Sequence, residues 1–244
     1  MNVLVTGGSG IVGSLVVPIL ARTHTVRVFD LRAPQVEGID YFQGDVTDFD
    51  ALARAMQGID ALLYLAMGNL KWAEVSGHVT AFDVNVKGVH LALKAAHEAG
   101  VTQAVYASSM SVYADDLMKR YFDNEDIPPD STGLYGFTKR LGELVCQNAA
   151  REWGMNVNAL RLCFPVSQER WKKETVRGTP TIATTADDVA RAIAAALDYK
   201  AGFQAFMISG DYEQKIMNMS KAKRLLDWKP LARPTRRKAK KQEA

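Results

Sequence analysis

The stretch of sequence that decides the fold is Val3-Leu4-Val5-Thr6-Gly7-Gly8-Ser9-Gly10-Ile11-Val12-Gly13. It predicts a buried strand, a glycine turn and the start of a helix, in that order. Its glycines satisfy the G-x-G-x-x-G dinucleotide pattern and also the wider spacing Gly7-x-x-Gly10-x-x-Gly13. One glycine of such a turn permits a positive φ, one allows a diphosphate to approach the backbone, and one lets helix and strand pack closely. The stretch therefore predicts a dinucleotide site, with the diphosphate at the positive end of the helix dipole.

A second apolar strand, Thr25–Phe29, leads directly into Asp30. This carboxylate follows Gly13 at close to the offset, roughly 20 residues, at which an acid binds the ribose 2′-hydroxyl of a dinucleotide. A carboxylate at that point favours NAD over NADP, because the 2′-phosphate of NADP would meet a like charge. Arg32 lies nearby and keeps NADP open as the less favoured cofactor.

Composition describes an ordinary globular chain of 244 residues, 48% of them hydrophobic and 23% charged. No apolar run reaches the roughly 18 residues of a membrane span, and the first strand begins too early to leave room for a secretory signal. Cys146 and Cys163 lack the spacing of a metal or redox motif, so we expect reduced thiols in a cytoplasmic protein without a membrane partner. The histidines lack ligand spacing, and no metal site is expected.

The formal net charge of +3 comes from the carboxyl-terminal end of the chain, where Lys and Arg follow one another closely after Lys229. We expect residues 231–244 to form a basic, disordered tail. The body of the chain offers no basic groove, so no specific nucleic-acid partner is expected.

Strand and helix signals continue to alternate beyond Asp30, which is typical of a parallel sheet with helices on both faces. We predict an α/β fold, a Rossmann-type doubly wound parallel sheet, with an NAD-binding core over residues 1–162. Residues 163–230 are expected to form a small C-terminal substrate-binding region interleaved with that core. Pro18 lies inside the first helix, where we expect a local kink rather than a break. Strands are expected over 39–43, 61–66, 101–107, 157–162 and 203–209, helices over 50–57, 81–99, 134–153, 186–199 and 220–226, and an exposed loop over 114–133.

Polar residues at the carboxyl ends of the predicted strands indicate where chemistry would occur, because ligands of open α/β sheets bind at that edge. Tyr135 and Lys139 lie one turn apart on a predicted helix, so they project from one face. An ammonium beside a phenol favours the phenolate, and we expect Lys139 to lower the Tyr135 pKa. Tyr135 would then exchange a proton with a substrate oxygen to which Ser109 is hydrogen-bonded. The structural alternative is a core tyrosine beside a snorkelling lysine.

The glycine turn, Asp30, Ser109 and Tyr135-Gly136-Phe137-Thr138-Lys139 recur in this order in the extended short-chain dehydrogenase/reductase family. The chain resembles the NAD-dependent epimerase/dehydratase branch of that family over about residues 1–230. Each motif is weak by itself, but the combination is specific. Further motifs that carry the resemblance are Gly44–Asp48, Tyr64–Ala66, Asn85–Gly88, Ser108–Tyr113, Asp187–Ala190 and Leu225–Pro230.

The resemblance implies roles for particular residues of this chain. Ser109, Tyr135 and Lys139 would be catalytic, with Ser111 the less favoured substitute for Ser109, and Lys139 would also hold the nicotinamide ribose. A homodimer would form through two helices of each subunit, with residues 134–153 in one of them. The implied NAD-binding set is Gly7, Gly10, Ile11, Val12, Gly13, Asp30, Asp45, Val46, Leu65, Ala66, Asn85, Tyr135 and Lys139.

Departures from the family pattern bear on the substrate. Nucleotide-sugar epimerases carry Asn-x-x-Gly-Pro where this chain has Cys163-Phe164-Pro165-Val166-Ser167, and their C-terminal part is longer, which argues against a bulky nucleotide sugar. The compact length and the Trp228-Lys229-Pro230 ending resemble uronate dehydrogenases, which oxidise a free sugar acid to a lactone with NAD. Ser167, Arg170 and Arg177 would then meet the substrate carboxylate. A solvated charged loop is the alternative for this segment.

Three interpretations follow. The first is an NAD-dependent oxidoreductase that acts on a hydroxyl or hemiacetal of a small sugar or sugar acid. The second is an epimerase or dehydratase in which the hydride returns and NAD is recycled while bound. The third is a non-catalytic NAD(P)-sensing protein, whose function would not need Ser109, Tyr135 and Lys139.

Overall fold

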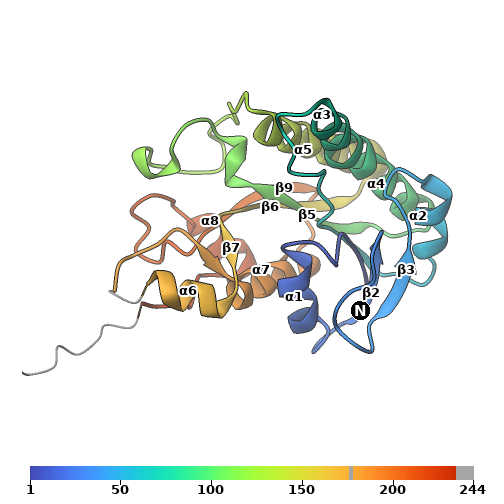
Figure 1. Cartoon of the computed structure of the whole chain (residues 1–244), viewed down its shortest axis with the longest axis horizontal. Coiled ribbons are helices and arrows are strands. Elements are labelled where there is room, and N and C mark those ends of the chain that lie inside the picture. The colour runs from blue at the N-terminus through green and yellow to red at the C-terminus, as the bar shows by residue number, and fades with distance from the viewer. Residues whose placement is uncertain (176–177, 235–244) are drawn as a thin grey trace, which may run out of the picture.

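The structure of the chain, a computed structural model, describes residues 1–175 and 178–234. Within these ranges its centre is a seven-stranded sheet in the order β3-β2-β1-β4-β5-β6-β9, in which all neighbouring strands are parallel (Figure 1). The predicted Rossmann-type doubly wound sheet is confirmed. The strands are β1 (Asn2–Thr6), β2 (Thr25–Asp30), β3 (Asp40–Gln43), β4 (Ala61–Tyr64), β5 (Gln103–Ser109), β6 (Asn156–Leu162) and β9 (Phe203–Ile208).

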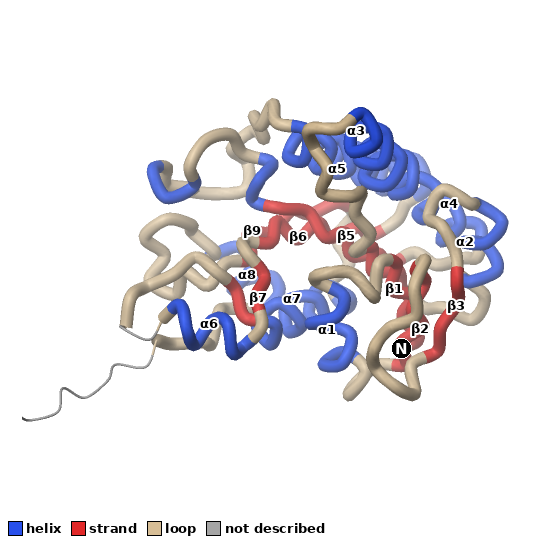
Figure 2. The backbone as a smooth tube through the Cα atoms, in the orientation of Figure 1, coloured by secondary structure: helices blue, strands red, loops and turns tan. Residues whose placement is uncertain are grey.

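Helices cover both faces of this sheet (Figure 2). One layer contains α1 (Gly13–Leu20) and α7 (Ala186–Asp198), and the other contains α2 (Phe49–Ala55), α4 (Val89–Glu98) and α5 (Leu134–Trp153). Successive residues of β1 alternate between the layers: Val3 and Val5 pack with the α1 and α7 side, and Leu4 packs with the α2 and α4 side. Because both faces are buried, the middle of a central strand is mostly apolar, as in Val3–Val5 of β1 and throughout β4.

The order in which the chain adds strands to the sheet reverses at β1, and this reversal determines where the site lies. The chain winds from β1 outward through β2 to β3, then returns to place β4 on the other side of β1. Thr6, the last residue of β1, pairs in register with Tyr64 of β4. The loops that follow these two strands therefore leave in opposite directions and open a crevice between them, which is where open α/β sheets bind ligands.

The prediction of one helix over 81–99 is wrong, because the helical segment begins earlier and is not α-helical throughout. The chain instead forms α3 (Val75–Phe82), a π-helical turn over Asp83–Gly88, and then α4. The wider turn directs Asn85 into the protein. Gly88 is needed there because a Cβ would lie 2.6 Å from the Tyr64 hydroxyl oxygen. Single π turns of this kind are frequent at functional sites.

The exposed loop expected over 114–133 is only partly exposed. Phe122 is fully buried and forms an isolated β-bridge with Met217. The carboxylate of Glu125 accepts a hydrogen bond from the Met207 backbone N–H at 3.0 Å, at the end of the sheet. Apolar residues that are remote in sequence therefore bury a segment that looks polar when it is read alone.

The C-terminal region contributes to both the sheet and the layers. Strand β9 extends the central sheet, while β7 (Pro165–Val166) and β8 (Thr184–Thr185) form a separate parallel pair. Trp228 is buried against α7, where its indole N–H donates to the Asp188 carbonyl oxygen at 2.9 Å. The remaining helices are α6 (Gln168–Glu174) and α8 (Ser220–Leu226).

Cys146 and Cys163 are both free and buried, as the sequence predicts. The basic tail predicted over 231–244 falls, from residue 235 onward, outside the described residues. None of the helices described for residues 1–175 and 178–234 is long and apolar enough to cross a membrane.

Candidate active site

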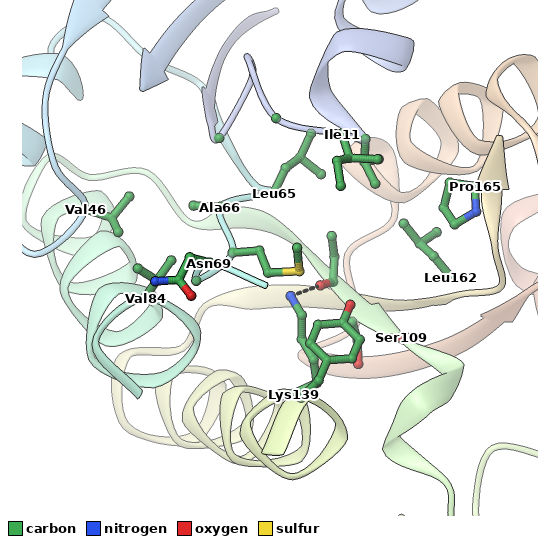
Figure 3. A pocket seen from close by; sticks show the side chains of 18 of the residues that line it. Ile11, Val46, Leu65, Ala66, Asn69, Val84, Ser109, Lys139, Leu162 and Pro165 are labelled. Carbon is green, nitrogen blue, oxygen red and sulfur yellow. Dashed lines mark hydrogen bonds between the residues drawn. The ribbon is translucent and has the colours of Figure 1, made fainter. Parts of the chain in front are cut away.

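A cavity of about 930 Å³ opens at the carboxyl ends of β1, β4, β5 and β6 (Figure 3). In the figure, Lys139 and Ser109 point into it from one side, across from Ile11 and Leu65. The cavity brings together residues that are far apart in the sequence. The predicted site residues that line it are Gly7, Gly10, Ile11, Val12, Asp30, Asp45, Val46, Leu65, Ala66, Ser109, Ser111, Tyr135 and Lys139.

The glycine turn after β1 leaves room for a diphosphate. Gly7 has a φ of +75°, and a Cβ there would lie 2.5 Å from the backbone nitrogen of Ala66. Gly13 does not line the cavity, but a Cβ there would lie 2.5 Å from the Gly7 carbonyl oxygen. Side chains at these positions would therefore fill the crevice or push α1 away from the turn. The turn fits the diphosphate of a dinucleotide, which binds backbone N–H groups at a helix N-terminus.

Asp30 lines one end of this cavity, the end that is expected from the sequence to hold the adenosine of the cofactor. One carboxylate oxygen accepts a hydrogen bond from the Ser9 N–H at 3.0 Å, and the other accepts one from the Arg32 N–H at 3.2 Å. Each oxygen keeps further acceptor capacity for a ribose hydroxyl. These bonds also tie the glycine turn to the end of β2, so Asp30 both shapes the turn and faces the cavity.

Lys139 is a buried cation at the other end of the cavity. Its side chain is on α5, and its Nζ donates to the Ala107 carbonyl oxygen at 2.8 Å (Figure 3). Nζ lies 5.9 Å from the centroid of the Tyr135 ring. Burial lowers the Lys139 pKa to about 8. The residue is therefore an ammonium near neutral pH that loses its proton in mildly alkaline solution.

The direction of the Tyr135 pKa shift is opposite to the one expected from the sequence. Burial raises the pKa of its phenol above the ordinary value, and the neighbouring Ser109 hydroxyl acts in the opposite direction. The expected net lowering of the Tyr135 pKa by Lys139 is therefore wrong for this geometry. Helical spacing predicts the nearness of the amine, but it does not predict how strongly the phenol is removed from water.

Ser109 is the last residue of β5 and is held in one orientation. Its Oγ accepts a hydrogen bond from the Ser111 backbone N–H at 3.1 Å, which closes the short 3₁₀ turn Met110–Val112. The hydroxyl hydrogen is left to donate to another oxygen. Ser109 can therefore hold a substrate oxygen next to Tyr135, which lines the same cavity.

Comparison with known proteins identifies the family. A model of the family described as "NAD dependent epimerase/dehydratase family" matches residues 3–186. The chain belongs to the NAD dependent epimerase/dehydratase family. The predictions of this family of enzymes, and of NAD as its cofactor, are confirmed.

Two curated relatives from this comparison differ in their chemistry. A 3 beta-hydroxysteroid dehydrogenase/Delta 5→4-isomerase of Mycobacterium tuberculosis is 42% identical over 121 residues, which are 46% of this chain and 32% of that protein. A UDP-glucose 4-epimerase of Neisseria meningitidis serogroup B is 32% identical over 173 residues, 63% of this chain and 50% of that protein. The matches thus span half of these relatives' length or less.

Solved structures agree on the fold. A mutated uronate dehydrogenase superposes with a TM-score of 0.79 at 21% identity, over 96% of this chain and 82% of that chain. MoeE5 in complex with UDP-glucuronic acid and NAD superposes with a TM-score of 0.78 at 21% identity, over 95% of this chain and 94% of that chain. At such identities the likeness shows the shared architecture of the epimerase/dehydratase family alone.

Asn85, which carries one of the epimerase/dehydratase motifs, lies behind the cavity wall. Its side-chain oxygen accepts a hydrogen bond from the Gly68 N–H at 3.3 Å, and its amide nitrogen donates to the Thr138 hydroxyl at 2.9 Å. It does not line the cavity. Asn85 therefore joins the loop after β4 to α5, and its side chain does not lie where a ligand in the cavity would contact it.

Of the residues expected to bind a substrate carboxylate, those that the structure describes lie outside the cavity lining. Ser167 caps α6, where its Oγ accepts from the Arg170 N–H at 3.2 Å, and it does not line the cavity. Arg170 also lies outside the cavity lining and pairs with Glu174 at 2.7 Å. Arg177 lies outside the described residues. A helix thus replaces the charged loop, because Ser167 supplies the N-cap that the sequence reading missed.

Several residues of the cavity were not predicted. Trp72, on the loop after β4, stacks on Tyr135 with ring centroids 5.6 Å apart and an interplanar angle of 16°. The rule that ligands bind at strand ends points from the sequence to this loop, from Ala66 onward, and to the residues after Leu162, but it assigns no role to Trp72 itself. The lining residues to which the sequence assigned no individual role include Met67, Asn69, Thr80, Met110, Leu117 and Leu162, whereas Cys163, Phe164 and Pro165 lie in the segment that the sequence already linked to the substrate.

A buried ion pair lies next to Ser109 and to the helix that carries Tyr135 and Lys139. Arg161 of β6 binds both carboxylate oxygens of Glu143 of α5, at 2.9 and 2.8 Å. Ser108 donates to the same carboxylate at 2.6 Å, and Arg161 also donates to the Tyr113 hydroxyl. Bidentate geometry and complete hydrogen bonding make such a buried pair tolerable. The network joins β5, β6 and α5, and so holds Ser109 in place relative to the helix that carries Tyr135 and Lys139.

Among residues 1–175 and 178–234, no three His, Cys, Asp or Glu side chains gather in a way that could hold a metal ion.

Proposed function

We propose that the chain is an NAD-dependent oxidoreductase that interconverts a hydroxyl or hemiacetal and the corresponding carbonyl, with Tyr135 as the acid/base. The observation that supports this most is that Ser109, Tyr135 and Lys139 line the same cavity as the glycine turn and Asp30. NAD, when bound, supplies the hydride acceptor, and the protein supplies binding, orientation and the proton path.

Each residue has a distinct task in this proposal. Tyr135 takes the proton of the substrate hydroxyl during oxidation and returns it during reduction. Ser109 donates its hydroxyl hydrogen to the same oxygen, while its Oγ accepts a hydrogen bond from the Ser111 N–H at 3.1 Å. Lys139 holds the nicotinamide ribose, and its Nζ lies 5.9 Å from the centroid of the Tyr135 ring.

A small sugar or sugar acid is the substrate class that the resemblance to uronate dehydrogenases favours. The curated relatives act, by their names, on a nucleotide sugar and on a hydroxysteroid, so their common feature is a ring-borne hydroxyl. The residues expected from the sequence to bind the carboxylate of a sugar acid are Ser167, Arg170 and Arg177. Ser167 and Arg170 do not line the cavity, and Arg177 lies outside the described residues.

The proposal predicts that Tyr135→Phe lowers turnover by at least ~100-fold, the low end of general acid–base catalysis, and leaves NAD affinity unchanged. Turnover is followed by the absorbance of the reduced cofactor with a panel of cyclic alcohols and sugars, and affinity by calorimetry. Tyr121→Phe is the matched control, because Tyr121 is exposed and lies outside the cavity lining. Turnover at the unmutated level in Tyr135→Phe would refute the assigned role.

A second candidate is an epimerase or dehydratase that recycles bound NAD, which the similarity to UDP-glucose 4-epimerase favours. This activity converts substrate without accumulating reduced cofactor, whereas a net oxidoreductase forms one reduced cofactor for each substrate oxidised. A non-catalytic NAD(P) sensor would bind the cofactor normally and be indifferent to loss of Tyr135 or Lys139.

We also propose that the protein is a homodimer through α3 and α5. These helices contact each other and leave a row of apolar side chains in solvent. Phe82 of α3 meets Phe137 of α5 edge to face at 6.2 Å, which makes the row continuous across both helices. Contiguous exposed apolar surface of this kind marks protein–protein contacts.

A further inference from the structure

The cationic side chains that line the cavity lie where a substrate would not reach them freely. Of the described residues that line it, Arg32 and Lys139 are the ones with cationic side chains. Arg32 follows β2 beside Asp30, at the adenosine end. Lys139 is buried, donates to the Ala107 carbonyl oxygen, and in the proposed function holds the cofactor ribose. Within residues 1–175 and 178–234, the substrate end of the cavity therefore offers no free cation to replace the water that a carboxylate or diphosphate would lose.

Most side-chain hydrogen-bonding groups at the substrate end are already engaged. The Thr80 hydroxyl accepts from the Asn69 N–H and donates to the Gly77 carbonyl, both at 3.3 Å. The Asn69 side-chain oxygen accepts from the Lys71 N–H at 2.9 Å. Beyond Ser109 and Tyr135, the Asn69 amide nitrogen and the Ser111 hydroxyl remain. A free sugar carries a hydroxyl on most of its carbons, and each one that is buried without a partner weakens binding.

Two aromatic side chains line the substrate end from either side of Ser109. Trp72 follows β4 and Phe164 follows β6, and these strands are the two neighbours of β5, which ends at Ser109. Trp72 is 46% exposed and Phe164 is 62% exposed, although both are large and apolar. Exposed aromatic rings that line a cavity offer an apolar ligand a large contact area.

Phe164 is held in this position against its own backbone preference. Its φ is +40°, in the left-handed region where a bulky residue is strained. The Phe164 carbonyl oxygen accepts from the Thr184 N–H at 3.1 Å, and the Cys163 N–H donates to the Ile208 carbonyl oxygen at 2.9 Å. Surrounding bonds therefore impose the strain, and the result is a phenyl ring presented to the cavity. Strain of this kind collects at ligand-binding sites.

Trp72 is also held by its surroundings. Its loop lies against the start of α3, where a Cβ on Gly77 would overlap the Lys71 carbonyl group. A second glycine, Gly68, lies as close to the backbone of Thr80, because a Cβ there would be 2.6 Å from the Thr80 carbonyl oxygen. Close backbone packing at both ends of the loop positions the indole over Tyr135.

We infer that the substrate of this site is an uncharged secondary alcohol, or its ketone, whose ring body is largely apolar and lies against Trp72 and Phe164. The inference rests on the proposed function, because it takes the reacting oxygen to lie between Ser109 and Tyr135. It replaces the sugar acid expected from the sequence with a neutral, less hydroxylated ring.

The test compares substrates that differ in one property at a time, with the full chain and NAD. Methyl 4-hydroxycyclohexanecarboxylate and 4-hydroxycyclohexanecarboxylate share a ring and differ in charge. Decalin-2-ol and glucose differ in hydroxylation, and glucuronate adds the charge to the sugar. We expect kcat/KM to be at least about tenfold higher for the ester than for the acid, and for decalin-2-ol than for glucose. Higher values for the acid or for glucuronate would overturn the inference.

Variants test the two aromatic contacts. Trp72→Ala and Phe164→Ala are expected to raise the KM for decalin-2-ol by at least about tenfold and to leave NAD affinity unchanged. Tyr121→Ala, which removes an exposed aromatic ring outside the cavity lining, is the control. Phe164→Arg places a cation at the substrate end and should shift the preference from the ester toward the acid. Unchanged KM values in both alanine variants would refute the contacts.

A binding measurement separates this inference from the proposed function. Calorimetry with the Tyr135→Phe variant and NADH reports affinity for the same compounds without turnover. If no compound is oxidised but decalin-2-ol still binds at least about tenfold more tightly than glucuronate, the inference about the substrate holds and the proposed activity fails. If the order of affinities is reversed, the inference about the substrate fails regardless of activity.

Discussion

Lys139 is a positive charge in surroundings that disfavour it, and this sets the acid–base behaviour of the site. Burial lowers its pKa to about 8, and the negative charge of nearby Glu143 opposes that effect. Its Nζ also lies 5.0 Å from the centroid of the Tyr106 ring, over a face that attracts cations. A bound dinucleotide would add ribose oxygens and a negative diphosphate, and both favour the ammonium.

We therefore expect NAD affinity to fall as the pH rises through the Lys139 pKa. Below about pH 8 the lysine is already charged, whereas above it the cofactor must bind together with a proton. The expected weakening is about tenfold between about pH 7 and about pH 9.5, corresponding to a pKa that the cofactor raises by about one. Calorimetry in two buffers of different ionisation enthalpy measures both the affinity and the proton uptake.

Lys139→Met is the control for this prediction, because it removes the titrating group and keeps an unbranched apolar stem. It should bind NAD more weakly at neutral pH and show no slope through about pH 8. An unmutated protein whose affinity is constant over this range, with no proton uptake, would show that Lys139 does not contact the cofactor.

At the scale of elements, the glycine turn requires glycine because the end of β1, the start of α1 and the backbone after β4 pack closely there. A Cβ at Gly7 would collide with the backbone after β4, and one at Gly13 would collide with the turn itself. The positive φ of Gly7 is a separate requirement. Backbone conformation and close approach can be told apart, because Gly58 has a φ of +73° with nothing near its missing Cβ.

We expect Gly7→Ala to destabilise the protein more than Gly58→Ala and to weaken NAD binding by at least ~10-fold. Gly58→Ala adds only the left-handed strain of roughly 1 kcal/mol, whereas Gly7→Ala adds the same strain and a clash that moves β1 or β4. Thermal unfolding with and without NAD measures both effects. Equal losses of stability in the two variants, with NAD binding retained in both, would mean that the close approach at Gly7 is unimportant.

Helix ends show how well local sequence specifies an element. Asp48 caps α2, where its carboxylate accepts from the Ala51 N–H at 3.0 Å, and aspartate is a residue type preferred at this position. The long helix α5 has the predicted bounds. Helical periodicity did not predict the π turn at Asp83–Gly88, which lies where Gly88 packs closely against Tyr64 of β4.

At the scale of the whole molecule, the exposed side of α3 and α5 is the surface on which assembly depends. Val75, Val79 and Phe82 follow one another along one side of α3, and Phe137 and Leu144 lie on α5. Val75 is 80% exposed, which is unusual for a β-branched apolar residue in a helix. A second copy of the chain could cover this row with an identical row, as a two-fold interface requires.

We predict that the full chain is a dimer by light scattering coupled to gel filtration. The double variant Val79→Glu and Leu144→Glu should shift it to monomer at micromolar concentration, because buried carboxylates without partners are costly. Leu231→Glu is the control, since Leu231 is exposed on the C-terminal segment away from both helices. A monomeric unmutated chain, or a double variant that remains dimeric, would refute the predicted interface.

The sequence by itself determined the strand–turn–helix unit, the acid after β2, and the helix that carries Tyr135 and Lys139, because each is a pattern within a short contiguous segment. Only the tertiary structure decided which way the Tyr135 pKa moves, where Ser167 and Arg170 lie, and that Trp72 and Phe164 line the substrate end. These properties depend on burial and on contacts between segments far apart in the chain. Desolvation is set by everything that surrounds a group, and neighbouring residues in the sequence are only a small part of those surroundings.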